Sequence, residues 1–435
     1  IVIATTFTKT LEYCQDKALD FDALSVFMRI GHLIGNDTPV KAIRVLPPNT
    51  TLSWNKDKGL HLYSTPIKNC FSGDLTLSYD EAIEAYSHYF SLSISRRLPD
   101  SDNFTVPISG GRDSRHILFE LIKQGAKPAS SMTLQYRPPA TNDDTRVAKL
   151  ICERLSIEHT VVQRPDNWFD VVLNEIYLSN FAGGGHSWML PMARFIGEQG
   201  YSTSYDGLAG GIVTAGQTMD GTALQLLRDG QLENFAHRIF KSNGLENFNQ
   251  YALTSDFSKE VSYERAVNRL IKELKQYENF GSPLMAYTFW NRTRRAISSI
   301  PFSILSRVDN VHCPYLDNDF FDFCTSLNPE FCINRPFHDD IINRAYPEWA
   351  DIPYQNKSLV APINSDCRQY YRRSVNDLIR YLWQRRKTQS TLISEKYIRK
   401  RVAKSLFTGN QEQPWYMRPA VYMYELERLI NHSGC

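Results

Sequence analysis

The stretch that decides the fold is FTVPISGGRDSRHILFEL, which runs from Phe104 to Leu121. Its apolar start predicts a short strand over residues 104–108, and its end predicts a helix over residues 112–124. Between them lie a serine, two glycines, an aspartate and a second serine. Small residues let backbone N–H groups approach phosphate oxygens, and the dipole of the following helix favours an anion at its N-terminus. The pattern therefore predicts a pyrophosphate-binding turn, Ser109–Ser114, between strand and helix.

Asp113 stands in the first turn of that helix. A carboxylate is a poor direct partner for phosphate, but it is suited to hold the Mg²⁺ that screens the phosphate charges. The turn matches neither GxGxxG nor GxxxxGK[ST], so a dinucleotide-binding fold and an ordinary P-loop are both disfavoured. The alternative interpretation is a tight turn that only connects strand and helix.

The segments that follow alternate between strand and helix. Strands are predicted over 130–135, 159–162 and 201–205, and helices over 142–155 and 168–179. This alternation is typical of βαβ units, in which helices cover both faces of a parallel sheet. Beyond about residue 215 the pattern is mostly helical. The predicted fold class is α/β, with a parallel sheet and a helical C-terminal part.

The N-terminal residues follow a different pattern. They predict a helix over 20–29 and then three strands, the first at 43–45, the second at 51–54 and the third after a turn at 58–59, with a Pro-Pro turn at 47–48 between the first two. A longer helix is predicted over 78–97, with Ser78 as its N-cap and Glu81 at capping-box distance. We therefore divide the chain into a small α+β domain, residues 1–75, and an α/β domain, residues 76–435.

The composition is that of a globular protein, because 42% of the 435 residues are hydrophobic and 22% are charged. No stretch reaches the ~20 consecutive apolar residues of a membrane span, so no membrane segment is predicted. The eight cysteines form no CxxC pair and no zinc-ligand cluster, which predicts reduced thiols in a cytoplasmic protein. The sequence starts at Ile1 rather than Met, and we expect it to begin within a strand.

Two segments each keep two interpretations. Residues 368–404 carry twelve basic and two acidic side chains although the net charge of the chain is only +2. They form either the solvated face of one or two helices or a surface for an anionic macromolecule or precursor peptide. Residues 181–188 contain three consecutive glycines followed by His186 and Trp188. They form either a flexible wall of a substrate pocket or a plain connector.

The Ser109–Ser114 turn resembles the SGGxDS pyrophosphatase loop of the asparagine synthetase family, whose members form amides by way of an adenylate. Other pieces are similar to family segments and occur in the family's order. They are ATTFTKTLEY at 4–13, Leu46-Pro47-Pro48, the segment 142–159 with Asp143, Asp144, Ala148 and His159, and Cys313-Pro314-Tyr315-Leu316-Asp317. The resemblance implies an ATP-pyrophosphatase domain of the HUP-like (adenine nucleotide alpha hydrolase-like) type, preceded by a partial glutaminase-like domain.

The resemblance also implies a reaction and its site residues. ATP would bind through its phosphates, a carboxylate would attack the α-phosphorus to give an acyl-adenylate and pyrophosphate, and an amine would then form the amide. The implied nucleotide-binding residues are Ile108, Ser109, Gly110, Gly111, Asp113, Ser114, Leu134, Asp206 and Gly207. Asp113 would also bind Mg²⁺. Lys357 either stabilises charge on the phosphates or the tetrahedral intermediate, or is an exposed loop lysine.

Partners follow from the same resemblance. They are a small-molecule or peptide carboxylate substrate and an amine donor. The sequence is compatible with a homodimer, and neither a membrane nor nucleic acid is an expected partner.

Three positions depart from the family pattern. Gly211 stands where relatives have a magnesium-binding aspartate, for which Asp206 is a candidate replacement. Leu208 stands where they have an acidic group or a tyrosine, and a leucine transfers no proton. The glutaminase cysteine is absent at Ile1, and Cys14 is expected in the core. We therefore weigh an amide ligase, including enzymes like β-lactam synthetases and lasso-peptide cyclases, against a non-catalytic nucleotide-binding relative and a tRNA-modifying enzyme of the lysidine synthetase type.

Overall fold

The computed structural model places most of the chain. It describes residues 2–64, 71–136, 140–164, 168–186, 188–214, 220–334, 336–362, 364–385, 389–407 and 416–432. The expectation for Ile1 lies outside the described residues.

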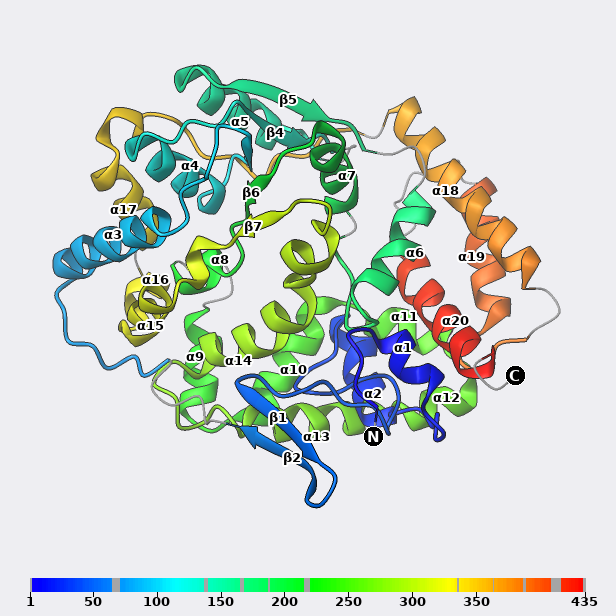
Figure 1. The fold of residues 1–435 in the computed structure, drawn as a ribbon. Coiled ribbons are helices and arrows are strands. Elements are labelled where there is room, and N and C mark those ends of the chain that lie inside the picture. The colour runs from blue at the N-terminus through cyan, green and yellow to red at the C-terminus, as the bar shows by residue number, and fades with distance from the viewer. Residues whose placement is uncertain are drawn as a thin grey trace.

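A five-stranded parallel sheet lies at the centre of the α/β part (Figure 1). Its strands are β3 (Phe104–Pro107), β4 (Ser130–Leu134), β5 (Glu158–Val162), β6 (Thr203–Tyr205) and β7 (Asn310–His312). They lie in the order β5-β4-β3-β6-β7, and each neighbouring pair is parallel. The predicted parallel sheet is confirmed, together with the strands expected in it. The sequence did not predict β7, which lies in the region beyond residue 215 where the pattern is mostly helical.

Helices cover both faces of this sheet. One layer holds α3 (Tyr79–Ser95), α4 (Asp113–Lys123) and α5 (Asp143–Arg154), and the other holds α7 (Met189–Gln199) with a π-helical segment, Ile300–Ile304. Strand side chains divide accordingly: Val106 of β3 is buried with the first layer, and Met132 of β4 is buried with α7. The predicted capping box at the start of α3 is confirmed, since Ser78 and Glu81 each bond the other's backbone N–H.

The rest of the chain is mainly helical, as predicted. The helices are α6 (Trp168–Leu178), α8 (Gly210–Val213), α9 (Gly221–Arg228), α10 (Leu232–Asn243), α11 (Glu246–Ala252), α12 (Ser255–Glu260), α13 (Tyr263–Leu274), α14 (Pro283–Thr288), the π-helical Phe289–Ile297, α15 (Asn318–Ser326), α16 (Glu330–Asn334), α17 (Phe337–Ala345), α18 (Ser365–Gln384), α19 (Glu395–Phe407) and α20 (Met417–His432). Within the described ranges, no helix combines the length and the apolar character that crossing a bilayer requires.

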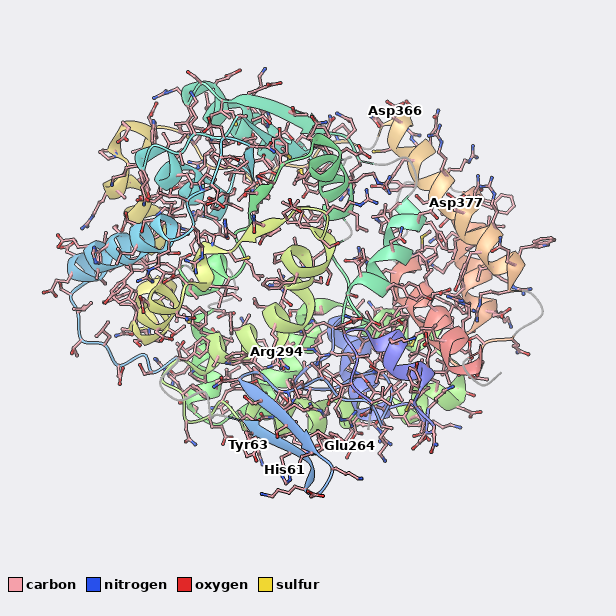
Figure 2. All side chains as sticks on the ribbon, in the orientation of Figure 1. His61, Tyr63, Glu264, Arg294, Asp366 and Asp377 are labelled. Carbon is pink, nitrogen blue, oxygen red and sulfur yellow. The ribbon has the colours of Figure 1, made fainter. Side chains whose placement is uncertain are left out.

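The basic stretch falls mostly on α18 and α19, which lie with α6 and α20 at one side of the molecule (Figure 1). Figure 2 labels Asp366 and Asp377 on α18, where Asp377 pairs with Arg380 at 2.8 Å. Glu395 of α19 pairs with Arg399 at 2.9 Å. These pairs are those of a solvated helical face, and binding of an anionic partner stays a prediction.

The N-terminal part contains α1 (Phe7–Glu12), α2 (Phe21–Ile30) and an antiparallel hairpin of β1 (Thr50–Asn55) and β2 (Gly59–Ser64). Figure 2 shows His61 and Tyr63 on this hairpin, at the rim of the molecule. The α2 helix packs against α13. Its buried Leu24 and Phe27 share a core with α20, whereas its buried Val26 and Ile30 belong to the core that contains β3 and α4. The boundary at residues 75 and 76 stays a prediction.

The strand predicted at 43–45 is wrong, because these residues are irregular. Their backbone groups have other partners: the Val45 N–H donates to the Asn36 carbonyl at 3.0 Å, and the Ile43 carbonyl accepts from the Thr38 hydroxyl at 2.9 Å. The guanidinium of Arg294, labelled in Figure 2, donates to the Leu46 carbonyl at 2.9 Å. Hydrogen bonds to the nearby Asn36 and Thr38, together with the distant Arg294 at the Leu46 carbonyl, therefore replace the expected strand ladder.

Candidate functional site

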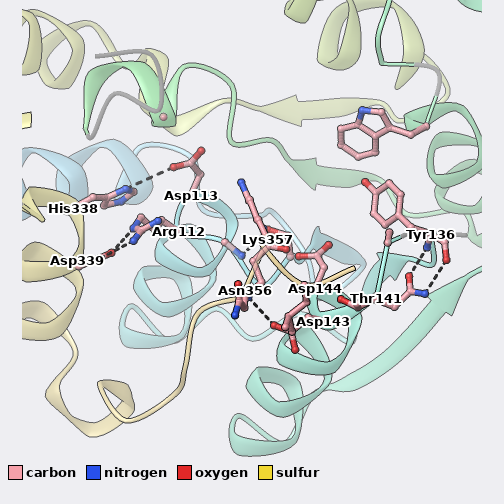
Figure 3. A pocket seen from close by; sticks show the side chains of 18 of the residues that line it. Arg112, Asp113, Tyr136, Thr141, Asp143, Asp144, His338, Asp339, Asn356 and Lys357 are labelled. Carbon is pink, nitrogen blue, oxygen red and sulfur yellow. Dashed lines mark hydrogen bonds and ion pairs between the residues drawn. The ribbon is translucent and has the colours of Figure 1, made fainter. Parts of the chain in front are cut away.

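The candidate site lies where the strand order of the sheet reverses. From β3 the chain proceeds outward to β4 and β5, and it then returns to β6 and β7 on the other side of β3. Loops at the carboxyl ends of β3 and β6 therefore diverge, and such a switch point is where open α/β sheets bind ligands. A pocket of about 770 Å³ opens there (Figure 3). Its lining includes Ser109, Gly111, Arg112, Asp113, Tyr136, Asp143, Asp144, Trp188, Gly211, His338, Asp339, Gln355 and Lys357.

The glycine turn, residues 109–114, follows β3, and side-chain oxygens accept hydrogen bonds from its backbone N–H groups. The Ser109 N–H donates to the Ser114 hydroxyl at 3.0 Å, and the Gly111 N–H donates to the Ser109 hydroxyl at 3.1 Å. The Gly110 N–H donates to Asp144 Oδ1 at 2.6 Å. A Cβ at position 110 would lie 2.8 Å from Gln355 Cβ, so only glycine fits there without displacement. The turn thus holds three backbone N–H groups together on short polar contacts.

Asp113 is the first residue of α4 and lies on the floor of the pocket. Its side chain keeps 35% of its exposure, yet burial raises the pKa of the carboxyl to about 7. The Gly211 N–H, Arg112 and Lys357 act in the opposite direction and lower this pKa. Asp113 therefore titrates near neutrality, where a cation ligand or a proton can occupy the same carboxylate.

The loop after β6 makes room for Asp113. A Cβ at Gly210 would lie 2.6 Å from Asp113 Cγ, and a Cβ at Gly207 would lie 3.0 Å from Asp113 Cβ. Burial raises the pKa of Asp206 to about 6, and one oxygen of this carboxylate accepts from the Leu208 N–H at 2.8 Å. Asp206 and Gly207 lie beneath the pocket wall rather than on it, whereas Gly211 lines the pocket.

Two buried histidines stand behind Asp113. Nδ1 of His338 lies 3.7 Å from Asp113 Oδ1 and 2.9 Å from the Thr214 hydroxyl, and Nε2 lies 3.1 Å from Nδ1 of His116. Burial lowers the pKa of His338 to about 3, so this ring is neutral at physiological pH. Asp113 therefore contacts a neutral imidazole on this side, and its nearby cations are Arg112 and Lys357.

A segment from α17 towards α18, residues 352–357, crosses over the glycine turn. We call it the strap. Its Gln355 N–H donates to the Gly110 carbonyl at 3.0 Å, and its Asn356 N–H donates to Asp143 at 2.7 Å. Figure 3 shows the Lys357 side chain directed between Asp113 and Asp144, where its charge opposes the rise that burial causes in the pKa of both carboxyls. The fold thus places Lys357 in the same pocket as the predicted turn.

Two arginines of the turn region contact the strap, and the Arg112 guanidinium lies 4.7 Å from the centre of the Tyr354 ring. Arg115 donates to the carbonyls of Ile352 at 2.8 Å and Pro353 at 2.6 Å, and its guanidinium lies 4.2 Å from the centre of the Tyr354 ring. Arg112 pairs with Asp339, whose Oδ2 accepts at 2.6 Å. These contacts link the pocket floor to segments more than two hundred residues away.

Ile108 and Leu134 are buried, at 3% and 2% exposure, and neither lines the pocket. The wall at this end is made by Tyr136 and Trp188, whose ring centroids lie 6.4 Å apart. Asn142 clamps Tyr136 by accepting from its N–H at 2.6 Å and donating to its carbonyl at 2.7 Å. Adenosine contacts by the two aliphatic residues stay a prediction.

The sequence indicated Trp188. It did not indicate Tyr136, Asn142 or the hydrogen bond between Gly110 and Asp144. The φ angle of Asn142 is 59°, a left-handed conformation that asparagine tolerates better than most residues. An asparagine eight residues after the end of β4 was the available signal. His186 lies outside the pocket lining, and its N–H bonds Glu175.

A magnesium site can be assessed from the donor chemistry. Among the described residues, no group of three or more His, Cys, Asp or Glu side chains is arranged to hold a metal. Mg²⁺ bound with a nucleotide needs fewer protein ligands, because phosphates and waters complete the octahedron around one or two carboxylates. Asp113, partly exposed on the pocket floor, fits this role.

Comparison with known protein families identifies a match to part of the chain. A family model described as asparagine synthase matches residues 86–180. This range contains the glycine turn, Asp143 and Asp144, and it ends before the β6 loop and the strap. No curated protein sequence matches the chain significantly. The matched part is similar to a family of ATP-dependent amide ligases, which supports a ligase-type enzyme.

Proposed function

We propose that this chain is an ATP-dependent amide ligase of the asparagine synthase type. It activates a carboxylate as an acyl-adenylate with release of pyrophosphate, and an amine then takes the acyl group. One observation carries the proposal: the glycine turn with Asp113 and the loop with Gly211 meet at the switch point of the sheet, and Lys357 faces them across one pocket. The family match over residues 86–180 supports the same chemistry.

Different residues of the chain contribute to different parts of the reaction. Ser109, Gly110, Gly111 and Ser114 bind the β- and γ-phosphates through N–H and hydroxyl groups. The carboxylate substrate attacks the α-phosphorus, so that a new P–O bond forms and the bond to pyrophosphate breaks. Lys357 stabilises negative charge that develops on the phosphates. Asp113 would hold Mg²⁺, which would neutralise charge on the pyrophosphate.

The substrate is the carboxylate of a small molecule or of a peptide, and it need not be aspartate. Leu208 is buried at 4% exposure and supplies no group for proton transfer in the amide-forming step. The amine nitrogen therefore loses its proton to another group or to solvent. We further propose a cytoplasmic location and a glutaminase-like ancestry for residues 1–75.

A second candidate is a nucleotide-binding relative without turnover. It is favoured by Gly211, which brings no carboxylate to the site, and by the apolar Leu208. In that case ATP binds in the pocket and no pyrophosphate is released.

Pyrophosphate release from ATP separates the two candidates. We expect release that depends on an added amino acid or peptide, and we expect Asp113→Ala to lower it by at least about 100-fold. Asp351→Ala is the matched control, because Asp351 pairs with Arg154 at the surface and its loss should change the rate by less than about 2-fold. Tight ATP binding without release under any substrate would support the second candidate. Equal rates for the two variants would exclude Asp113 from the site.

A further inference from the structure

The glycine turn is occupied by the protein itself. The N–H groups of Ser109, Gly110 and Gly111 already donate to side-chain oxygens, and these acceptors are of two kinds, hydroxyl and carboxylate. Ser109 and Gly111 donate to hydroxyls, which can still donate their own hydrogen to a phosphate oxygen while they accept. Gly110 donates to the Asp144 carboxylate, which is an acceptor only and carries a negative charge. A phosphate oxygen therefore cannot share the Gly110 N–H with Asp144.

Asp144 is held in this position from two sides. It stands in the first turn of α5, where the helix dipole favours a carboxylate. Burial raises the pKa of Asp144, and the Gly110 N–H and the charge of Lys357 on the strap oppose this rise. The Asp144 carboxylate thus accepts from one N–H donor and lies within the electrostatic influence of a cation, and a phosphate group would use the same two groups.

We propose that Asp144 is an internal competitor for the phosphate subsite, so that pyrophosphate-bearing ligands bind by displacing its carboxylate from the Gly110 N–H. This inference rests on the proposed nucleotide function of the pocket and adds the residue that sets its affinity. Displacement needs only a side-chain rotation on the first turn of α5. The apparent affinity of the pocket is then lower than its contacts alone would give, because each ligand must first break the bond between Gly110 and Asp144.

Two substitutions show whether Asp144 weakens ligand binding because it occupies the Gly110 N–H or because it carries a negative charge. Asp144→Ala removes the acceptor and the charge, whereas Asp144→Asn removes the charge and keeps an oxygen that can accept from Gly110. We expect Asp144→Ala to bind inorganic pyrophosphate with Mg²⁺ about 10- to 100-fold more tightly than the wild type, as measured by calorimetry. Asp144→Asn should gain less. Glu153→Gln removes one charge from the exposed face of the same helix and should change the affinity by less than about 2-fold.

An NMR titration gives a second readout that does not depend on the alanine variant being stable. With ¹⁵N-labelled glycine, the Gly110 amide of the wild type should shift when pyrophosphate is added, and Asp144→Asn should move this resonance even without ligand. Melting curves show that each variant is folded.

The outcomes are distinguishable. If wild type binds pyrophosphate and Asp144→Ala binds it no more tightly, the competitor role is wrong while the proposed function stands. If neither the wild type nor any variant binds pyrophosphate or ATP, the proposed function fails and the competitor role fails with it. An affinity that rises equally in both Asp144 variants also contradicts occupancy, because charge alone would then explain it.

Discussion

The two loops at the switch point differ in what they offer a ligand. The turn after β3 presents Ser109, Asp113 and a row of backbone N–H groups. The loop after β6 has its carboxylate, Asp206, bonded to its own backbone beneath the pocket wall, and only Gly211 of this loop lines the pocket. The β3 turn therefore supplies the binding groups, and the glycines of the β6 loop supply the space that the Asp113 side chain occupies.

The largest effect should come from filling that space. In Gly210→Ala the new methyl group would lie 2.6 Å from Asp113 Cγ, so the carboxylate must move. We expect pyrophosphate release to fall by about 100-fold, and the free energy of unfolding to fall by about 1–3 kcal/mol. The rate of pyrophosphate release measures the first effect, and urea unfolding curves measure the second.

Gly211→Ala is the matched variant for this test. Its methyl group would lie 3.7 Å from Asp113 Oδ2, an ordinary van der Waals distance, so we expect a clearly smaller loss in rate and stability. Equal effects of the two alanine substitutions would show that the β6 loop does not confine Asp113.

A second test uses the titration of Asp113. Its pKa is about 7 in the folded chain against 3.8 for an ordinary aspartate, so the folded state keeps this proton when the unfolded state has lost it. Stability from this group is therefore fully present below pH 4 and is lost as the pH rises through 7. We expect the free energy of unfolding of the wild type, relative to Asp113→Asn, to fall between pH 5 and pH 8. Urea unfolding at both pH values measures it, and parallel stabilities would mean that Asp113 is not buried as described.

The same comparison explains how far the sequence could predict the site. The β3 turn is local: strand, small residues and helix are adjacent in sequence, so periodicity and turn chemistry predicted its place on the sheet. The geometry around it depends on distant segments. That Gln355 covers Gly110, or that Gly210 faces Asp113, follows from tertiary packing of residues far apart in the chain. The irregular path of residues 43–45 has a different origin, because hydrogen bonds with the nearby Asn36 and Thr38 outweigh local strand propensity.

The smallest effect should come from adding a binding group to the β6 loop. Position 211 has space for a side chain beside Asp113 Oδ2, and Gly211 is not among the residues with positive φ. Gly211→Asp would bring a second carboxylate to the pocket, and we expect it to raise the affinity for Mg²⁺ in the presence of pyrophosphate by about 3- to 10-fold. Gly211→Asn, of similar shape and without the charge, should stay near the wild-type value. An unchanged Mg²⁺ titration in the aspartate variant would mean that the phosphates and Asp113 alone complete the metal site, so that the difference between the two loops has no consequence for the metal.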